Sequence, residues 1–383
     1  MDYLNAPISF KLRKTLCYCR LYGPRRTLAK IRGQIHMRKV YEHLPRAGGT
    51  PRTGQTVGII GCGNYAYSTI AHFLDSNAGK VIRGVMDTDL NRAASLFEEY
   101  KAAYYTDDAD KLIGDDGIEL IYIASNHASH AEYAIAALRA DKNVCIEKPH
   151  VVSEDQLARL TGAMRESSGR VFLGFNRRRS RFGSIITETL AGEEGPGMYS
   201  WFVVGHQIGP DHWYMRPEEG GRVLGNLCHW TDFTLGLFGS DAYPIEINPT
   251  SAGRSDCDVA VTYTCADGTI AVITFSEKGH AFEGIRERFC AHKGDCLLEM
   301  TDFQVLKVER QGRAKVHKAL FRDQGHQASI VSCYDAVRRS LPYAREAQTA
   351  YVWDTAMLFL KTKEALESDS RVLVYPYPAG CEQ

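Results

Sequence analysis

A glutamate and a lysine stand at the end of an apolar run, in the segment Cys145-Ile146-Glu147-Lys148-Pro149-His150. Both charges are costly to bury unless a site uses them. Pro149 removes a backbone donor and biases Lys148 towards an extended conformation. Two interpretations are open at this point: a strand terminator whose charges reach water, or a carboxyl group and an ammonium group that do chemistry at a strand end.

A second chemical signal is the glycine-rich pattern Gly61-x-Gly63-x-x-Ala66, which follows the apolar strand expected at 56–60 and opens a helix. The first glycine permits a tight turn, and the second lets the backbone approach a pyrophosphate at the helix N-terminus. Alanine in the third place allows the helix to pack closely on the strand. The residues predicted to bind a dinucleotide here are Gly61, Gly63, Asn64, Tyr65 and Ala66.

Asp87 ends the next expected strand, about 20 residues beyond the glycines. Its carboxylate is placed to accept hydrogen bonds from an adenosine ribose and to repel a 2′-phosphate. This arrangement favours NAD over NADP. Arg92 lies close enough in the sequence to keep NADP as the alternative.

The elements that must position these groups alternate between strand and helix. This alternation predicts a Rossmann-type α/β domain with a doubly wound parallel sheet. From about Met198 onward strands follow one another, which predicts a second, α+β domain with a large mixed or antiparallel sheet. The expected domains are a basic extension and linker (1–53), a dinucleotide-binding domain (54–150) and a substrate and oligomerisation domain (151–383). The expected strands are 56–60, 81–86, 120–124, 144–146, 171–175 and the hairpin 258–264 with 270–276; the expected helices include 92–100 and 130–140.

Charge is distributed unevenly along the chain. Residues 1–53 carry 12 basic and two acidic residues, a balance of +10, whereas the remainder carries 34 basic and 44 acidic residues, a balance of −10. Two helix-like stretches of this arm, 10–20 and 28–35, mix basic with apolar residues. They could dock on an anionic membrane surface or on a partner enzyme of the same pathway. The alternative is an arm that packs on its own body or on an oligomer mate.

Other partners are not expected from the sequence. It contains no nucleic-acid recognition motif, no HExxH or similar paired metal-ligand spacing, no bilayer-length apolar run and no signal peptide. The eleven cysteines are scattered, as in a protein with reduced thiols. We therefore expect a cytoplasmic protein without a metal, peripheral at the inner membrane face if the arm docks there.

Several segments together resemble the Gfo/Idh/MocA family of sugar and cyclitol oxidoreductases, over roughly residues 55 to 345. Within that family the chain looks most like the branch of bacterial surface-polysaccharide and glycan-modification pathways. The segments that carry the resemblance are Gly61 to Ala66, Ile121 to His130, Glu147-Lys148-Pro149, Gly174-Phe175-Asn176-Arg177-Arg178, Gly220 to Asp232 and Gly325-His326-Gln327.

The resemblance implies the catalytic roles. Lys148 contacts the nicotinamide ribose and the reacting oxygen, with Glu147 beside it, and stabilises alkoxide charge as a hydride leaves for nicotinamide C4. His229 is the base that takes the hydroxyl proton. Asn226 stands where the family usually has an acid, so it can orient a group but cannot accept a proton. Asp232 reaches the same site if 224–238 is helical; a solvated or capping carboxylate is the alternative.

Further binding residues follow from position and from the same resemblance. Ser125, Asn126 and His127 end a strand at the cofactor crevice, where they are expected to bind ribose or nicotinamide. His130 is placed with them, or is a helix-end histidine with no ligand. Arg177 is expected to bind an acidic or phosphorylated sugar and Trp213 to stack on a sugar ring; a solvated charge run and simple packing are the alternatives.

The leading hypothesis is an NAD(P)-dependent dehydrogenase or reductase that acts on a ring hydroxyl or ketone of a sugar, sugar nucleotide or cyclitol. We expect it to serve polysaccharide or glycan biosynthesis and to form a homo-oligomer. The alternative is a catalytically inactive dinucleotide-binding regulator or scaffold of the same fold.

Overall fold

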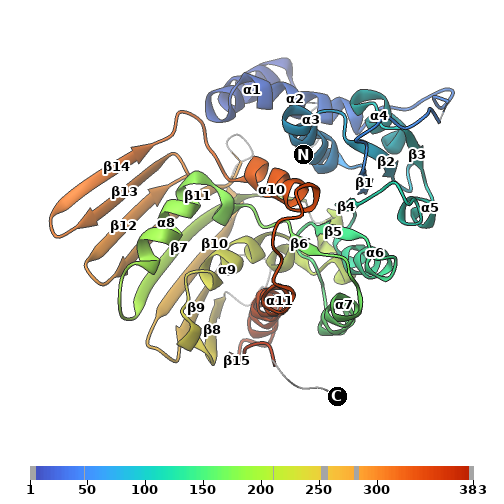
Figure 1. Cartoon of the computed structure of the whole chain (residues 1–383). Coiled ribbons are helices and arrows are strands. Elements are labelled where there is room, and N and C mark those ends of the chain that lie inside the picture. Colours follow the sequence, from blue (N-terminus) through green and yellow to red (C-terminus); the bar gives the residue numbers. More distant parts are fainter. Residues whose placement is uncertain (1–5, 47, 210, 252–257, 280–283, 379–383) are drawn as a thin grey trace. The chain divides into compact units, whose positions relative to one another are not determined.

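The computed structural model describes residues 6–46, 48–209, 211–251, 258–279 and 284–378. The chain forms two compact units, each assembled from separate stretches of sequence. Residues 25–174 and 326–352 form the dinucleotide unit, and residues 1–24, 175–325 and 353–383 form the sheet unit. Figure 1 labels the elements of both units. The domain limits expected from the sequence, 1–53, 54–150 and 151–383, stay a prediction.

A six-stranded sheet lies at the centre of the dinucleotide unit. All its strands are parallel, in the order β3-β2-β1-β4-β5-β6, so the order reverses between β1 and β4. Ligands of such sheets bind beyond the carboxyl ends of the strands at this reversal. The predicted doubly wound sheet is confirmed. The strands are β1 (Val57–Ile60), β2 (Ile82–Met86), β3 (Tyr104–Thr106), β4 (Leu120–Ile123), β5 (Asn143–Ile146) and β6 (Val171–Leu173).

Helices cover both faces of this sheet, as the apolar character of its strands requires. All four residues of β1 are buried, and so are all four of β4. Local signals begin some helices: the Asp89 side chain accepts a hydrogen bond from Asn91 N, and that of Ser153 accepts one from Gln156 N. The helices are η1 (Ala66–Ala71), α3 (His72–Ala78), α4 (Leu90–Tyr100), α5 (Ala109–Ile113), α6 (His127–Arg139), α7 (Glu154–Glu166) and α10 (His326–Arg338).

Helix α10 joins the dinucleotide unit from a distant part of the sequence. The Tyr122 hydroxyl of β4 donates to the Ile330 carbonyl at 2.7 Å, and Cys145 Sγ of β5 lies 3.3 Å from Cys333 Sγ. Both contacts are buried within the unit. No element is predicted here from the sequence, because neither contact leaves a local pattern.

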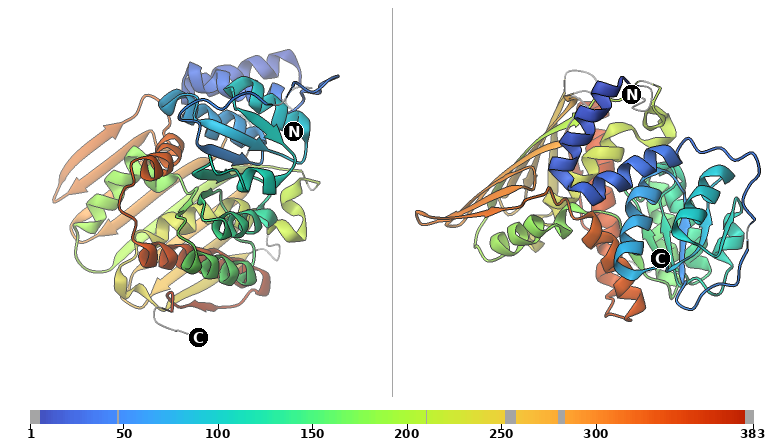
Figure 2. Two further views of the ribbon diagram at one scale, coloured as in Figure 1. Left: turned by 45° about the vertical axis from the view of Figure 1, so that its right-hand side comes forward. Right: turned by 90° about the horizontal axis from the view of Figure 1, so that it is seen from above.

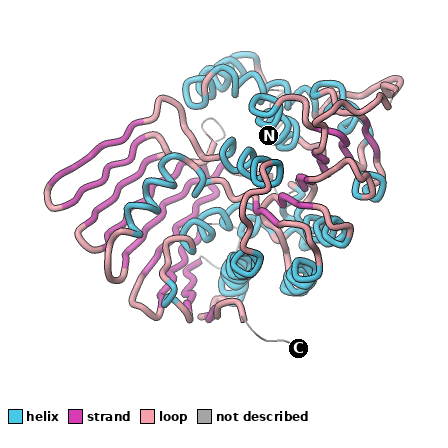
Figure 3. Tube along the Cα trace, viewed as in Figure 1, coloured by secondary structure: helices cyan, strands magenta, loops and turns pink. Residues whose placement is uncertain are grey.

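A nine-stranded mixed sheet dominates the other unit, in the order β14-β13-β12-β11-β7-β10-β9-β8-β15. Strand β7 pairs parallel with β10 and antiparallel with β11. The expected hairpin is confirmed: β9 and β10 are antiparallel, and Gly268 turns with φ +89°. Figure 3 shows these strands running side by side. They are β7 (Gly197–His206), β8 (Ile245–Ser251), β9 (Val259–Cys265), β10 (Ile270–Gly279), β11 (Arg286–Lys293), β12 (Cys296–Thr301), β13 (Val305–Arg310), β14 (Arg313–Lys318) and β15 (Val372–Val374).

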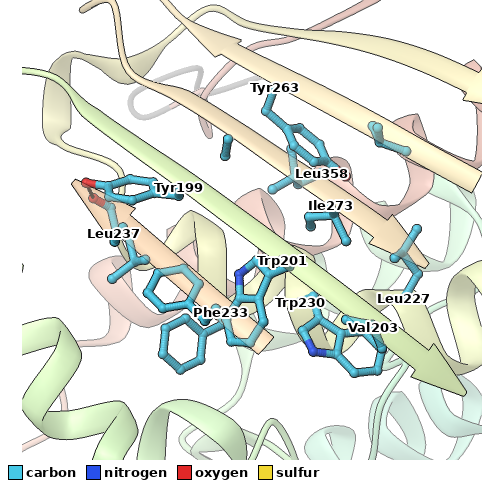
Figure 4. Close-up of a cluster of buried hydrophobic side chains, with 14 of the residues drawn as sticks. Tyr199, Trp201, Val203, Leu227, Trp230, Phe233, Leu237, Tyr263, Ile273 and Leu358 are labelled. Carbon is cyan, nitrogen blue, oxygen red and sulfur yellow. Dashed lines mark hydrogen bonds between the residues drawn. The ribbon is translucent and has the colours of Figure 1, made fainter. Parts of the chain in front are cut away.

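One face of the large sheet carries the core of its unit, and the other face is open. Trp201, Trp230 and Phe233 meet in the buried cluster of Figure 4, with ring centroids of Trp201 and Phe233 5.1 Å apart. On the opposite face Met198 and Phe202 are more than half exposed. Figure 2 shows helices lying against one side of the sheet. The helical segments that begin or lie in this unit are η2 (Arg177–Arg179), α8 (Arg181–Ala191), η3 (Trp213–Met215), η4 (Pro217–Glu219), η5 (Val223–Leu227), α9 (Cys228–Leu235) and η6 (Ser240–Ala242); α11 (Arg345–Ser368) runs from one unit into the other.

The basic arm forms two helices, α1 (Ile8–Tyr22) and α2 (Pro24–His36), which contain the expected stretches 10–20 and 28–35. Helix α1 is attached to the sheet unit, where Arg322 N donates to the Leu21 carbonyl at 2.7 Å. Most of α2 belongs to the dinucleotide unit. Part of the arm therefore packs on its own body. Within the residues that the structure describes, no helix has the length and hydropathy needed to cross a bilayer.

Candidate active site

The glycine turn leaves room at one position and none at the other. Gly61 has φ +86°, and a Cβ there would lie 2.5 Å from Ser125 N, so the turn between β1 and η1 requires glycine. A Cβ on Gly63 would meet no atom within 4 Å. This open space beside the backbone is what a pyrophosphate needs at such a turn. The residues present therefore fit a dinucleotide.

Asp87 is held at the same edge of the sheet by two backbone amides. Its Oδ2 accepts from Cys62 N at 2.7 Å and its Oδ1 from Asp89 N at 2.9 Å. Each carboxylate oxygen keeps a further lone pair, so both still have capacity for ribose hydroxyls. The Arg92 guanidinium pairs with Asp89 at 3.3 Å, within reach of the same corner.

The Glu147 carboxyl group links the end of β5 to the glycine motif. It hydrogen-bonds with the Tyr65 hydroxyl, and a Cβ on Gly174 would lie 2.6 Å from its Oε1. Burial raises the pKa of Glu147 to about 7, while the neighbouring Lys148 ammonium opposes the shift. The apolar run ends on charges because they lie at the carboxyl edge of the sheet, where Glu147 is tied to the turn.

The end of β4 lies next to the glycine turn, since it is Ser125 N that a Cβ on Gly61 would meet. Ser129 Oγ donates to Asn126 Oδ1 at 2.6 Å and lies 2.7 Å from Ser125 Oγ. His127, the first residue of α6, is 2% exposed. These side chains are thus ordered by one another around the first turn of α6.

His130 has a structural position between two loops. Its Nδ1 lies 2.8 Å from the Pro149 carbonyl oxygen and its Nε2 3.2 Å from that of Ser125. Burial lowers its pKa to about 4, so the ring is neutral and donates to one of the two carbonyls. It connects the loop after β4 to the loop after β5, whether or not it also contacts a ligand.

In the sheet unit, Asn226 and His229 are the two half-buried residues in an otherwise buried helical stretch, 222–234. Asn226 lies in η5 and His229 one turn later in α9. The His229 ring meets Phe175 edge-on, with centroids 6.1 Å apart. Residues three apart on a helix share a face, so both polar side chains open to the same side.

Asp232 lies on α9 but is buried, with 1% exposure. Its Oδ1 is 4.0 Å from an Arg178 guanidinium nitrogen, and Gly236 leaves the room for that guanidinium, because a Cβ there would lie 2.3 Å from its Cζ. Pairing with Arg178 is therefore a second possible role for Asp232, besides the substrate binding expected from the sequence.

Arg177 is enclosed in a buried network. Its Nε lies 2.6 Å from Glu287 Oε2, and its guanidinium carbon lies 4.5 Å from the Trp230 ring centroid. Trp230 Nε1 and Gln324 Nε2 donate to the same Glu287 carboxylate at 2.9 and 2.6 Å. These contacts supply a structural role for Arg177 that the sequence did not indicate; its role in sugar binding stays a prediction.

Trp213 lies in the short helix η3, half-buried, in the loop after β7. His212 caps this helix, with Nδ1 accepting from Tyr214 N at 3.2 Å, and its ring stacks on Trp213 with centroids 5.8 Å apart. The pair presents an aromatic surface of the kind that packs on sugar rings, although its contact with a sugar stays a prediction.

The predicted residues thus fall into two groups, one in each unit. Gly61 to Ala66, Asp87, Ser125 to His130 and Glu147-Lys148 gather at one edge of the parallel sheet, whereas Asn226, His229 and Asp232 share helix α9 and its preceding turn. A third group was not predicted from the sequence: the side chains of α2 that reach the glycine turn. The helical spacing of these residues could be seen in the sequence, but the sequence did not show that the helix packs on η1. Within the described residues, no cluster of three or more His, Cys, Asp or Glu side chains has the arrangement of a metal site.

The parallel doubly wound sheet and its open glycine turn are the features of a dinucleotide-binding domain, and Lys148 stands at its carboxyl edge. Residues 55–175 match the family model GFO_IDH_MocA, an oxidoreductase family with an NAD-binding Rossmann fold. Residues 55–175 therefore form the NAD-binding domain of a Gfo/Idh/MocA oxidoreductase. The predicted family, oxidoreductase class and nicotinamide dinucleotide cofactor are confirmed by this match.

Two curated relatives show how far the similarity extends. YrbE of Bacillus subtilis (strain 168), described as an uncharacterized oxidoreductase, is 29% identical over 229 residues, which cover 58% of this chain and 67% of YrbE. Inositol 2-dehydrogenase 2 of Saccharopolyspora erythraea is 33% identical over 123 residues, or 32% of this chain and 36% of that enzyme. The chain therefore spans about a third of the second relative.

Among solved structures, levoglucosan dehydrogenase in complex with NADH and levoglucosan superposes with a TM-score of 0.69. It is 17% identical, and the match covers 83% of this chain and 99% of that one. At this identity the likeness establishes the fold of both sheets and no more.

Proposed function

We propose that the chain moves a hydride between a nicotinamide cofactor and a ring hydroxyl or ketone of a sugar, sugar nucleotide or cyclitol. The observation that carries this proposal is the tie between β5 and the dinucleotide turn: Glu147 hydrogen-bonds to Tyr65 of the glycine motif, and Lys148 follows it. The ammonium group therefore belongs to the edge of the sheet on which the cofactor fits.

Each residue has a distinct task in the proposed reaction. The Lys148 ammonium stabilises negative charge on the substrate oxygen, and His229 takes the hydroxyl proton, or returns it to a ketone in reduction. Asn226, on the same face as His229, orients substrate by hydrogen bonding. The nicotinamide ring, when bound, supplies or accepts the hydride.

The substrate class follows from the relatives together with the site. Inositol and levoglucosan, named for two of them, are cyclic polyols, and a proton-accepting imidazole beside an amide suits a ring hydroxyl. A role in polysaccharide or glycan biosynthesis rests on the resemblance of the sequence alone. We assign NAD as the cofactor because Asp87 would repel a 2′-phosphate, with NADP as the alternative.

A second candidate is a dinucleotide-binding regulator or scaffold without turnover. Asn226 favours it, since an amide stands where an acid is usual and cannot relay a proton. The two candidates share the cofactor site and differ in turnover, so both must bind NADH.

The test is cofactor binding and turnover measured on the same proteins. NADH fluorescence gives Kd, and nicotinamide absorbance with a panel of cyclitols, free sugars and nucleotide-linked sugars gives kcat. Lys148→Ala should lower kcat at least about 100-fold and leave the NADH Kd within about threefold. Lys80→Ala, an exposed lysine of the same unit, is the control. Turnover in Lys148→Ala at the wild-type rate would contradict the assignment.

One substitution separates the two candidates. If the wild type binds NADH but turns over nothing in the panel, while Asn226→Glu gains activity, the regulator candidate is favoured. Absence of NADH binding by the wild type would remove both candidates.

We also propose that the arm docks on an anionic membrane surface. On α1, Ile8, Leu12 and Leu16 recur at four-residue spacing and are 74%, 60% and 70% exposed. On α2, Leu28, Ile31 and Ile35 form a similar exposed row. No acidic residue occurs between positions 8 and 36, whereas exposed Arg13 and Arg20 lie beside the α1 row. Apolar rows flanked only by positive charge fit an interface of anionic lipid.

Sedimentation with vesicles tests this docking. The Leu12→Asp/Leu16→Asp protein should lose most binding to phosphatidylglycerol-containing vesicles, and pure phosphatidylcholine vesicles should bind neither protein. Val40→Asp, at an equally exposed apolar residue of the arm, should bind as the wild type does. If the double variant and the wild type sedimented equally with the vesicles, docking of the arm on a membrane would be excluded. The same result would leave a protein as the partner of the arm.

The open face of the large sheet is proposed as the surface of a homo-oligomer. Met198 and Phe202 of β7 and Leu297 of β12 are exposed on this face, where Met198 and Leu297 both pair in register with His292 of β11. An apolar patch on an open sheet is a frequent interface. Phe202→Arg should therefore shift the protein to a smaller species in sedimentation velocity; an unchanged species would reject this face.

A further inference from the structure

The buried face of α2 lies directly on the helix that follows the glycine turn. Thr27, Ala29, Gly33 and His36 form this face. A Cβ on Gly33 would lie 2.9 Å from Ser68 Cβ, so the absence of a side chain there permits the close approach. The arm, which precedes the segment matched by the family model, is thus an integral part of the dinucleotide unit.

Side chains of α2 reach three successive points of the turn and of η1. The Arg26 guanidinium donates to the Ser68 carbonyl and, at 2.7 Å, to Thr69 Oγ1. Lys30 Nζ donates to Asn64 Oδ1 at 3.2 Å. These contacts fix the start of η1, the segment whose N-terminus faces the cofactor's phosphates in this fold.

The third contact is the most informative, because it falls between the two glycines. His36 Nε2 lies 2.7 Å from the carbonyl oxygen of Cys62, and the ring stacks on Tyr67 with centroids 4.1 Å apart at 19°. His36 is 2% exposed, and burial lowers its pKa, so the ring is neutral. A carbonyl can only accept, which places the single N–H on Nε2.

The amide on the other side of Cys62 is held as well. Cys62 N donates to Asp87 Oδ2 at 2.7 Å, and Cys62 Sγ lies 3.4 Å from the Met86 carbonyl oxygen. The residue between Gly61 and Gly63 is therefore fixed at its amide by β2 and at its carbonyl by the arm.

Because the Cys62 carbonyl is held in place, the geometry of the peptide bond also sets the direction of the Gly63 N–H. In a planar trans peptide the C=O of one residue and the N–H of the next point opposite ways. The Cys62 carbonyl points at His36, so the Gly63 N–H points away from α2. At Gly63 an added Cβ would find open space. A backbone donor on the side away from α2, at a residue where the chain leaves open space, is what an approaching pyrophosphate oxygen would meet.

We propose that His36 is a positioning residue for the dinucleotide: by donating to the Cys62 carbonyl, it aims the Gly63 amide at the cofactor's pyrophosphate. This inference rests on the proposed function only in that the turn binds a nicotinamide dinucleotide. It gives the arm a task that is independent of any membrane contact, since that contact would use the opposite, exposed face of α2.

Three variants of the 383-residue chain test the proposal by their NADH Kd and melting temperature. His36→Phe keeps a ring on Tyr67 but removes the donor, and should raise Kd about tenfold, the scale of one hydrogen bond. His36→Gln keeps an N–H at a similar reach and should restore most of the affinity. His72→Phe removes a half-buried imidazole of the same unit, on α3, whose ring lies against Phe73, and should leave Kd unchanged.

A ligand comparison separates aiming from general packing. The affinity lost in His36→Phe should also appear with ADP-ribose, which contains the pyrophosphate, and should be absent with adenosine, which lacks it. A merely structural histidine would weaken all three ligands together and lower the melting temperature.

The outcomes divide cleanly. If the wild type does not bind NADH, the proposed function fails. If the wild type binds and His36→Phe binds equally well, the inference on His36 fails while the proposed function stands. A second donor-less variant, His36→Met, repeats the comparison if the phenyl ring does not fit. Loss of folding in both, or equal loss of all three ligands, would assign His36 to packing and overturn the inference.

Discussion

The two units prepare for ligands in different ways. In the dinucleotide unit the site is made of backbone: Gly61 is forced by a close approach, and Gly63 leaves a space open. In the sheet unit the charged side chains near α9 already have partners, Arg177 on Glu287 and Arg178 near Asp232, while Asn226 and His229 keep partial exposure. A binding site made of backbone can be predicted from short sequence motifs. A binding site made of charged side chains is harder to predict, because it depends on which charges pair with one another in the folded protein.

The largest effect expected from this contrast concerns two adjacent arginines. Arg177→Ala should lower the free energy of unfolding by about 3 to 5 kcal/mol, because it leaves the Glu287 carboxylate buried without its cation. Arg178→Ala should cost less than about 1 kcal/mol, since its side chain is partly exposed and the Asp232 oxygen that pairs with it is 4.0 Å away. Denaturant unfolding followed by tryptophan fluorescence measures both. An Arg177→Ala protein as stable as the wild type but impaired in turnover would instead make Arg177 a substrate ligand.

These arginines also show what sequence could and could not predict. The parallel sheet, the hairpin at Gly268 and the glycine turn were predictable, because each is encoded by neighbouring residues or by a short period. The Arg177–Glu287 pair joins positions 110 residues apart, and α10 packs under β4 and β5 from beyond residue 325. No local pattern carries such pairings. The same limit hid His36, whose partner Cys62 was recognised only as part of a motif.

A smaller effect is expected from alanine at the two motif glycines. Gly63→Ala should raise the NADH Kd at least about tenfold with little change in melting temperature, because its Cβ would occupy the open space and not the protein interior. Gly61→Ala should instead lower the melting temperature by several degrees, because an alanine there would combine φ +86° with a backbone collision. Fluorescence titration and thermal melting on both proteins make the comparison. If Gly63→Ala bound NADH normally, the open space would not be the pyrophosphate site.

The smallest effect is the pH dependence of the dinucleotide unit. The pKa of Glu147 is raised to about 7 in the folded state, above an ordinary value of 4.5, because burial disfavours the carboxylate. The folded protein then binds a proton that the unfolded chain has lost, so this contribution is complete below pH 4.5 and disappears as the pH rises through about 7. Relative to Glu147→Gln, the cofactor-free wild type should lose about 1 kcal/mol of stability or more over that window. Parallel curves for the two proteins would show that Glu147 has an unshifted pKa.

The central claim is that a lysine of one unit and a histidine of the other act on one hydroxyl. A crystal structure of the protein with NADH and a cyclic polyol measures this directly. A hydroxyl in hydrogen-bond contact with both groups, at about 3 Å each, requires Lys148 Nζ and the near imidazole nitrogen of His229 to lie within about 6 Å of one another beside nicotinamide C4. We expect the two nitrogens to lie within that distance. Two nitrogens that face separate cavities, with the polyol bound to only one of them, would contradict it.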